Sequence, residues 1–387
     1  MLNQKTRRNS LKLQAGMSLI ELLIALVLGM TLAAGVIQIY VGATTTERSQ
    51  EARLRMQEGG RFGINFLSQE IRMAGYLGCL GSIEGTSANS ILDAPPNHFQ
   101  PGWGIQGWEA GGTGPGEPNN STLNLAEAGT DSGEWTTGDA NIVMPVFNAV
   151  PNSDIVRVWG GSGTAGTVSV INQGAPPSIT VESNAGISAN DFLMISDCEQ
   201  VDIAQACVVA ADAAPATTSL ITLSPGCAPG NVNGATITSV TNAGALAEVF
   251  RLQGTVFYVG KRGGAAANPP ALFRAQLANN GTLAAAEELI EGVESMQILY
   301  GVNVDEDVRS TADTYLTADL VTQWQDVISV RITLLMQSID DGTVPQPQAY
   351  TFNGVVYDGV AGGLPADRRV RRIFTTTVSL RNRALGV

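Results

Sequence analysis

A single carboxylate lies inside the longest apolar run of the chain. The run extends from Met17 to about Val41, and Glu21 is its only charged residue. An ionisable side chain inside a membrane span costs about 2.5–3.5 kcal/mol on insertion scales and marks a candidate functional group. The chemistry that would hold Glu21 there is pairing with a cation at the same depth.

A second candidate group carries oxygen ligands at every second position. Asn303, Asp305 and Asp307 could wrap a calcium ion as the first half of an EF-type loop does. Val308 stands where such a loop has its turn glycine, and Thr314 where it has its bidentate glutamate. Two interpretations stay open, a weak calcium site and a solvated hairpin loop, and these departures favour the loop.

Four cysteines, Cys79, Cys198, Cys207 and Cys227, follow the apolar run. If that run is a membrane anchor, they lie on the oxidising side, where disulfides form and persist. Two disulfides are therefore expected, and four cysteines allow three pairings. Free buried thiols are the alternative.

The sequence predicts no enzyme. His98 is the only histidine, which excludes metal cages built on several histidines and makes a Ser-His-Asp triad depend on one loop residue. The run GSGTAG at residues 161–166 has the spacing of a dinucleotide-binding loop. It precedes the strand pattern TVSVIN, however, whereas that fold needs a helix there. The net charge of −13 argues against a sequence-independent nucleic-acid binder.

The N-terminal charge pattern predicts the element that positions Glu21. Residues 1–16 contain four basic residues and no acid, and the apolar run that follows is long enough to cross a bilayer as a helix. Basic residues before the span keep that end cytoplasmic and place the rest of the chain outside. On these facts alone, a plain signal anchor and a cleaved signal peptide are alternatives, since Thr31–Ala34 could imitate a cleavage site.

Residues 42–78 are predicted to continue the helix as an amphipathic segment. Apolar residues recur at helical spacing, and charged residues fill the other face, so the apolar stripe should pack on a sheet. Gly59, Gly60 and Gly63 interrupt the segment. Because each glycine costs up to about 1 kcal/mol in a helix interior, a bend or a locally melted turn is expected there.

Residues 79–250 are predicted to form a loop-rich and β-rich insertion of a globular head. Gly, Pro, Asn and Ser dominate residues 85–135, which read as long loops. Trp103 and Trp108 lie in that region and are interpreted as buried loop anchors or, alternatively, as exposed contacts for a partner.

Residues 251–387 are predicted to form the C-terminal sheet of the head. Short strand patterns recur from residue 140 onward, and the last two, 326–338 and 371–382, are the clearest. Apolar and polar residues alternate in both. Each strand should therefore bury one face against the N-terminal helix.

The start of the apolar run resembles the processing signature of type IV prepilins. A short basic leader ends in Gly16, a hydrophobic Met17 follows, and the sequence SLIEL puts Glu21 five residues into the run. The resemblance implies cleavage between Gly16 and Met17 by prepilin peptidase, methylation of the new amine of Met17, and retention of the helix. Removal of the leader takes four of 22 basic residues and no acid, which leaves 18 against 35 and a net charge of −17.

Later blocks resemble the PilW family of minor pilins. They lie in the first 80 residues, in parts of 192–205 and in most of 250–387, and they include EIRMAGYLGC, ALFRAQL, EELIEGVESMQILYG, VISVRITLLMQS and RRVRRIFTTTVSLRNR. The resemblance implies an α+β, pilin-like fold with a long N-terminal helix packed on an antiparallel sheet. Residues 1–16 would be the cleaved leader and 17–41 the transmembrane or filament-core helix.

The resemblance also implies a function. The chain would be a non-enzymatic, low-copy minor pilin that primes pilus assembly at or near the tip and supports twitching motility. Its partners would be other minor pilins, the major pilin, prepilin peptidase and the inner-membrane assembly platform, with the head in the periplasm before assembly and in the pilus afterwards. The alternatives are a minor pseudopilin of type II secretion and a tip adhesin or DNA-uptake module. No cofactor is implied.

The resemblance favours one disulfide pairing. Cys79 and Cys198 lie in blocks that resemble the family, whereas Cys207 and Cys227 fall in the segment between them. We therefore expect 79–198 and 207–227, with local closure of Cys198 on Cys207 as the main rival.

Overall fold

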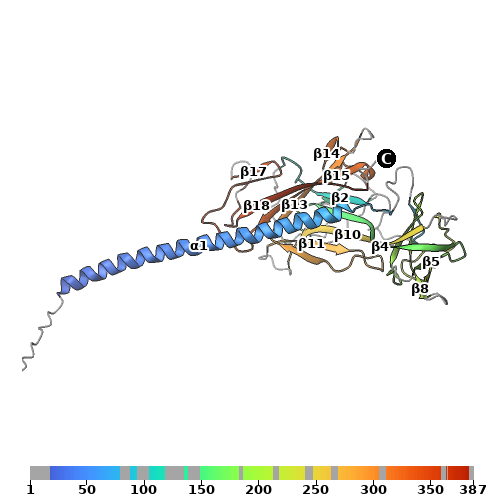
Figure 1. Ribbon diagram of the computed structural model, residues 1–387. Coiled ribbons are helices and arrows are strands. Elements are labelled where there is room, and N and C mark those ends of the chain that lie inside the picture. Colours follow the sequence, from blue (N-terminus) through green and yellow to red (C-terminus); the bar gives the residue numbers. More distant parts are fainter. Residues whose placement is uncertain are drawn as a thin grey trace, which may run out of the picture. The chain divides into compact units, whose positions relative to one another are not determined.

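The structure, a computed structural model, describes residues 18–78, 88–93, 104–117, 135–137, 149–182, 186–211, 218–239, 247–262, 269–304, 311–358, 363 and 365–382. The chain divides into two compact units, Met1–Glu51 and Ala52–Val387. The second unit, the head, includes the last part of the N-terminal helix and all the strands (Figure 1). One long helix and a β-rich head make an α+β protein, which confirms the predicted class.

A single helix, α1, runs from Leu19 to Arg72. It joins the predicted membrane segment to the predicted amphipathic segment without a break. The melted turn expected at the three glycines is wrong, because Gly59, Gly60 and Gly63 are all helical. Gly60 and Gly63 are among the buried residues of α1, with Met56, Leu67 and Ile71.

The glycines let the helix backbone approach the strands closely. A β-carbon on Gly60 would overlap the ring of Phe374, and one on Gly63 would lie 2.6 Å from Ile290 Cδ1. Interiors are packed to crystal density, so these atoms have no free space to move into. The glycines therefore cost helix propensity but permit a tight contact between helix and sheet.

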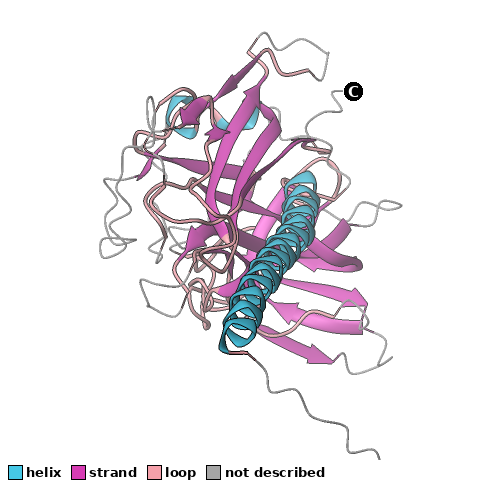
Figure 2. Cartoon of the chain, turned by 90° about the vertical axis from the view of Figure 1, so that its left-hand side faces the viewer, coloured by secondary structure: helices cyan, strands magenta, loops and turns pink. Residues whose placement is uncertain are grey.

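Part of the head is a four-stranded antiparallel sheet that packs against α1 (Figure 2). Its strands, in spatial order, are β14 (Thr314–Leu316), β13 (Val293–Val302), β15 (Val327–Gln337) and β18 (Arg371–Ser379). Short 3-10 helices η3 (Ala318–Leu320) and η4 (Trp324–Asp326) precede β15. The buried row Val330, Ile332 and Leu334 and the row Phe374 to Leu380 face the same core as the helix, as the alternation predicts.

A twelve-stranded sheet makes up most of the rest. Its main path runs β1-β7-β6-β10-β4-β5-β9-β8; β11 and β12 extend from β10, and β2 and β3 from β4. The bounds are β1 Asn89–Ser90, β2 Ile105–Ala110, β3 Trp135–Thr136, β4 Ile155–Asn172, β5 Ser178–Glu182, β6 Phe192–Ser196, β7 Val201–Gln205, β8 Val208–Ala211, β9 Thr218–Thr222, β10 Ala247–Gly260, β11 Ala271–Gln276 and β12 Glu287–Glu291. All pairs are antiparallel among the described strands except β1 with β7.

Two long strands join two hydrophobic cores. One core contains α1, the four-stranded sheet, β2 and the last residues of β10. The other contains β5, β6, β7 and β9 with the end of β4 and the start of β10. Strands β4 and β10 pair along most of their length and belong to both cores. The head therefore has a part built on the helix and a β-only part, connected by continuous strands.

A buried carboxylate ties the two sheets together. Asp154 precedes β4 and accepts hydrogen bonds from the backbone N–H of Ala110 on β2, at 3.0 Å, and of Ile298 on β13, at 2.7 Å. Its own N–H donates to the carbonyl of Met296 at 2.8 Å. Buried backbone groups need hydrogen-bond partners. Asp154 supplies the partner for three of them at the junction of the sheets: two N–H groups and one carbonyl.

A second acid, Glu109 on β2, lies beside Asp154. Thr113 donates to one of its carboxyl oxygens at 3.4 Å, while the other has no partner among the described residues. Burial and the charge of Asp154 raise the pKa of Glu109 to about 9. Burial also raises the pKa of Asp154, to about 7, but its two backbone bonds oppose that shift. Glu109 therefore keeps a proton at neutral pH, whereas Asp154 is the more readily ionised acid.

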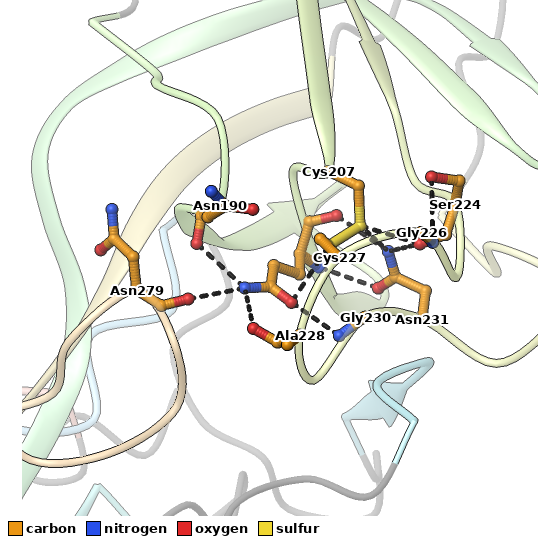
Figure 3. Close-up of a disulfide and its surroundings, with 10 residues drawn as sticks. Asn190, Cys207, Ser224, Gly226, Cys227, Ala228, Gly230, Asn231 and Asn279 are labelled. Atoms are coloured by element: carbon orange, nitrogen blue, oxygen red, sulfur yellow. Dashed lines mark hydrogen bonds between the residues drawn. A yellow bond between two sulfur atoms is a disulfide. The ribbon is translucent and has the colours of Figure 1, made fainter.

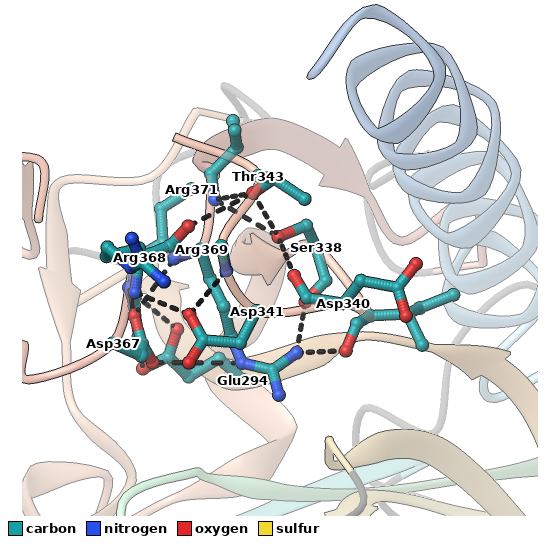
Figure 4. A network of polar contacts seen from close by, with 12 residues as sticks. Glu294, Ser338, Asp340, Asp341, Thr343, Asp367, Arg368, Arg369 and Arg371 are labelled. Carbon is teal, nitrogen blue, oxygen red and sulfur yellow. Dashed lines mark hydrogen bonds and ion pairs between the residues drawn. The ribbon is translucent and has the colours of Figure 1, made fainter. Parts of the chain in front are cut away.

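Ion pairs connect β18 to β13 and to the residues just before β18 (Figure 4). The nearly buried Arg371 donates to Glu294 and to Asp367, each at 2.7 Å at the closest, and Arg369 donates to the carbonyl of Ser338 at 2.6 Å. Burial raises the pKa of Glu294, although Arg371 opposes that shift. Beside this network, the hairpin of β16 (Tyr350–Phe352) and β17 (Val355–Tyr357) packs on Leu335. The hairpin thereby covers Leu335, near the end of β15.

We expect Gly60→Ala to lower the free energy of unfolding of the head by about 1–3 kcal/mol, because the added methyl group overpacks the contact with Phe374. Gly59→Ala is the matched control. Its β-carbon would lie 3.3 Å from Ile290 Cγ2, and the gain in helix propensity of up to about 1 kcal/mol should offset that contact. Chemical denaturation of the detergent-solubilised chain measures both, and equal effects would disprove the close-packing role.

We expect Glu109→Gln to flatten the pH dependence of stability. The folded pKa of about 9 lies above the ordinary value of 4.5 for a glutamate side chain. The folded state therefore holds a proton that the unfolded state loses, and stability falls as pH rises from about 5 to 9. The variant should melt higher than the parent at pH 8.5 and similarly at pH 5. Exposed Glu117→Gln is the control, and a pH slope unchanged by Glu109→Gln would refute the buried acid pair.

Candidate functional site

The N-terminal end of α1 contains the residues predicted to direct processing and assembly. Gly16 and Met17 lie outside the described residues. Glu21 is in the first turn of α1, its side chain is exposed, and it makes no hydrogen bond or ion pair among the described residues. A carboxylate in the first turn interacts favourably with the helix dipole. Its position leaves it available to a group from outside the chain.

The apolar part of α1 is exposed along its whole length. Large side chains from Leu19 to Val41 are about half or more exposed, up to 77% at Leu19. Within the described residues, α1 is the one helix long and apolar enough to cross a membrane, and none of its most apolar window is buried. Burial of such a surface is strongly favourable, so the segment is suited to contact with lipid or with an apolar protein surface.

Hydroxyl groups in this part of the helix are satisfied locally. Thr31 donates to the carbonyl of Leu28 at 2.9 Å, Thr45 to that of Val41 at 2.7 Å, and Thr46 to that of Gly42 at 2.9 Å. Threonine bonds of this kind use carbonyls three or four residues back in the same helix. The segment can therefore enter an apolar environment without unpaired hydroxyls at these positions.

The C-terminal end of α1 is fixed to β4 by backbone contacts. Gly75 N–H donates to the carbonyl of Trp159, and Gly161 N–H to that of Tyr76, both at 2.8 Å. A β-carbon on Gly160 would lie 2.9 Å from the nitrogen of Tyr76. The run GSGTAG thus lies inside β4, and its first glycine takes part in packing against the chain that leaves the helix. This location agrees with the rejection of a dinucleotide loop.

The β-only part of the head contains a disulfide between Cys207 and Cys227, as predicted (Figure 3). Beside it, Gln205 and Asn231 exchange hydrogen bonds: Gln205 N–H donates to Asn231 Oδ1, and Asn231 Nδ2 donates to the carbonyl of Gln205, both at 2.8 Å. Gln205 also accepts from Gly230 N–H at 2.8 Å and donates to the carbonyl of Asn279 at 2.7 Å. Both side chains are fully buried.

The second predicted disulfide is only half within the described residues. Cys198 is disulfide-bonded, which agrees with the prediction of no free thiol there. Cys79 lies outside the described residues. The rival closure of Cys198 on Cys207 is excluded, because Cys207 is bonded to Cys227.

The calcium hypothesis stays a prediction. Asn303 is described and its N–H donates to the carbonyl of Asp326 at 3.0 Å, but Asp305 and Asp307 lie outside the described residues. Among the residues that the structure describes, no group of three or more His, Cys, Asp or Glu side chains is placed to hold a metal ion.

The tryptophans and the histidine were the other residues considered for a site. Trp108 lies on β2 and is 1% exposed, so it is a buried anchor and not an exposed contact. Trp103 and His98 lie outside the described residues.

Sequence reasoning missed the polar residues that join the parts of the head. Glu109 and Asp154 are 45 positions apart, and Gln205 and Asn231 are 26 apart. A local pattern cannot show such pairs. The one signal in the sequence is an acid directly before a run of apolar residues, as at Asp154, and that signal is common to many strand starts.

Two families match the chain. Residues 256–382 match the family described as Type IV Pilus-assembly protein W, and residues 11–37 match the Prokaryotic N-terminal methylation motif. No curated protein and no solved structure matches it. The first match covers the end of β10 and all the strands of the four-stranded sheet, and the second covers Gly16, Met17 and Glu21.

The matched regions agree with the architecture, because one contains the first part of the exposed apolar segment of α1 and the other contains the four-stranded sheet on which later residues of α1 pack. Together they identify a prepilin-type N-terminal motif and a head region similar to Type IV Pilus-assembly protein W, which relates the chain to the type IV pilus.

Proposed function

We propose that this chain is a minor pilin that acts in low copy number to prime pilus assembly at or near the tip, and thereby supports twitching motility. The observation that carries the proposal is the exposed apolar segment of α1, which would be covered by the membrane first and by other pilin helices afterwards. Prepilin peptidase would cut between Gly16 and Met17 and the new amine would be methylated. The chain would then be held by the inner-membrane assembly platform.

Glu21 would set the register of the helix among its neighbours. Cleavage creates an ammonium at Met17, within about one helical turn of Glu21. In a bundle of helices, Glu21 of one subunit can meet the terminal amine of the next. Such a buried pair adds little net stability, but loss of one partner leaves a buried charge that costs about 3–5 kcal/mol. The pair would therefore specify position more than strength.

Charge and head size favour low copy number. The leaderless chain would carry a net charge of −17, and a regular lattice of such subunits would repel itself. The head has sixteen strands in its two main sheets among the described residues, and a helical lattice has little room for so large a head. Placement among other minor pilins and above the major pilin reduces both problems.

Glu21→Val is the direct test of the register role. We expect normal leader cleavage and a strong loss of the protein from sheared pili, because the apolar side chain inserts but cannot pair. Glu47→Ala, an exposed carboxylate of the same helix beyond the apolar run, is the control. Cleavage is followed by mobility on gels and incorporation by immunoblot. Full incorporation of Glu21→Val would discard the role.

Deletion of the gene distinguishes the pilus from a secretion apparatus. Loss of surface pili and of twitching supports the proposal. Loss of exoprotein release with normal pili would instead indicate a minor pseudopilin of type II secretion. The adhesin alternative loses one of its two motivating residues, since Trp108 is buried in the head.

A further inference from the structure

We propose that the outer edge of β8, residues Val208–Ala211, is a docking edge at which an extended, uncharged segment of a partner protein adds a further strand to the sheet. This inference goes beyond the proposed function and does not depend on it. It rests on the backbone edge, on the side chains beside it, and on the covalent and polar contacts that fix it.

The first observation is an open edge. β8 is the last strand of the path and pairs with β9 from Val208↔Thr222 to Ala211↔Ser219. Among the described residues no strand pairs with its other side (Figure 1). Half of the backbone N–H and C=O groups of an edge strand point outward and can accept a new strand.

The second observation is the lack of protection. Sheet edges are usually guarded by a charged residue, a proline, a bulge or a very short strand. β8 is short, with four residues, but its sequence VVAA has no charge and no proline. Its pairing with β9 has no register shift. In a chain with a net charge of −13, β8 and β9 contain no charged residue.

The third observation is an exposed apolar row beside the edge. The registers place Val170, Thr180, Leu220 and Ala210 in one line across β4, β5, β9 and β8. Val170 is 52% exposed and Leu220 39%, and Val208, two residues along β8, is 51% exposed. Side chains at alternate positions of an added strand would continue this row.

The fourth observation is that a disulfide and buried hydrogen bonds hold β8 in place before any partner binds. Cys207 directly precedes it and is bonded to Cys227, and the buried Gln205–Asn231 pair holds the same turn. A four-residue strand contributes little to the core, in which Val209 is only partly buried. These contacts keep the edge ordered, and a preordered edge loses less entropy when a partner binds.

The occupant follows from the chemistry of the edge. A neutral, extended segment with small β-branched residues at alternate positions would pair with the backbone and pack on the apolar row. A second copy of this chain fits less well, because it would bring two strongly acidic heads together.

A synthetic peptide tests the proposal against the full chain in detergent micelles. The probe is the uncharged peptide TVTVTVT, acetylated at its N-terminus, amidated at its C-terminus and labelled with a neutral fluorophore. Its comparison is the same peptide N-methylated on both edges, which removes the backbone donors. Fluorescence anisotropy should show saturable binding of the first and a loss of at least about tenfold for the second. No saturable binding, or equal binding of both peptides, would overturn the proposal.

Variants locate the binding. Val208→Lys places a charge at the edge and should reduce affinity by about tenfold or more, whereas Val232→Lys adds the same charge at another exposed valine and should leave it unchanged. The double variant Cys207→Ser with Cys227→Ser should weaken binding while the melting transition shows a folded head. Equal effects of the two lysine variants would place the site elsewhere. Self-association that Val208→Lys abolishes would instead identify a second copy as the occupant.

Discussion

The contact between α1 and the strands at Gly60 and Gly63 is the constraint on which the rest of the head depends. Side-chain atoms of Phe374 and Ile290 occupy the space that β-carbons would need, so the helix backbone itself forms part of the core. This contact fixes the last turns of α1 against β12 and β18. Directly after these turns, Gly75 and Tyr76 form backbone hydrogen bonds with β4. The sheet is thus built around the helix.

Charged and polar residues then connect the parts that apolar packing alone would leave independent. Asp154 joins β2 to β13, Arg371 joins β18 to Glu294, and Gln205 joins β7 to the disulfide turn. Each is nearly or fully buried, where a polar group without a partner costs about 1–3 kcal/mol or more. Such residues add specificity, because only one arrangement satisfies them. The acid pair at Asp154 also couples the junction of the sheets to pH.

Two apolar surfaces of α1 differ in their burial. The helix face with Leu67 and Ile71 is buried by the head, whereas the stretch from Leu19 to Val41 is left entirely exposed. A protein that folded only for its own stability would not expose so much apolar surface. The exposed stretch is long and apolar enough to cross a membrane, which agrees with the prepilin-type motif that covers its first part.

The sequence alone determined the long helix, the α+β class and the last two strands, because these depend on apolar run length and on alternation. For the Cys207–Cys227 bond, the resemblance to a family favoured the pairing, and the structure then selected it over the rival closure. Only the tertiary structure decided the role of the helix glycines. Helix propensity predicts a weak point in the helix at these residues, whereas in the structure they allow the helix backbone to pack closely against the strands. The tertiary structure likewise decided the pairing of Asp154 with Glu109 and the exposure of β8. Those features depend on which distant segments meet, and helical or strand periodicity contains no information about that.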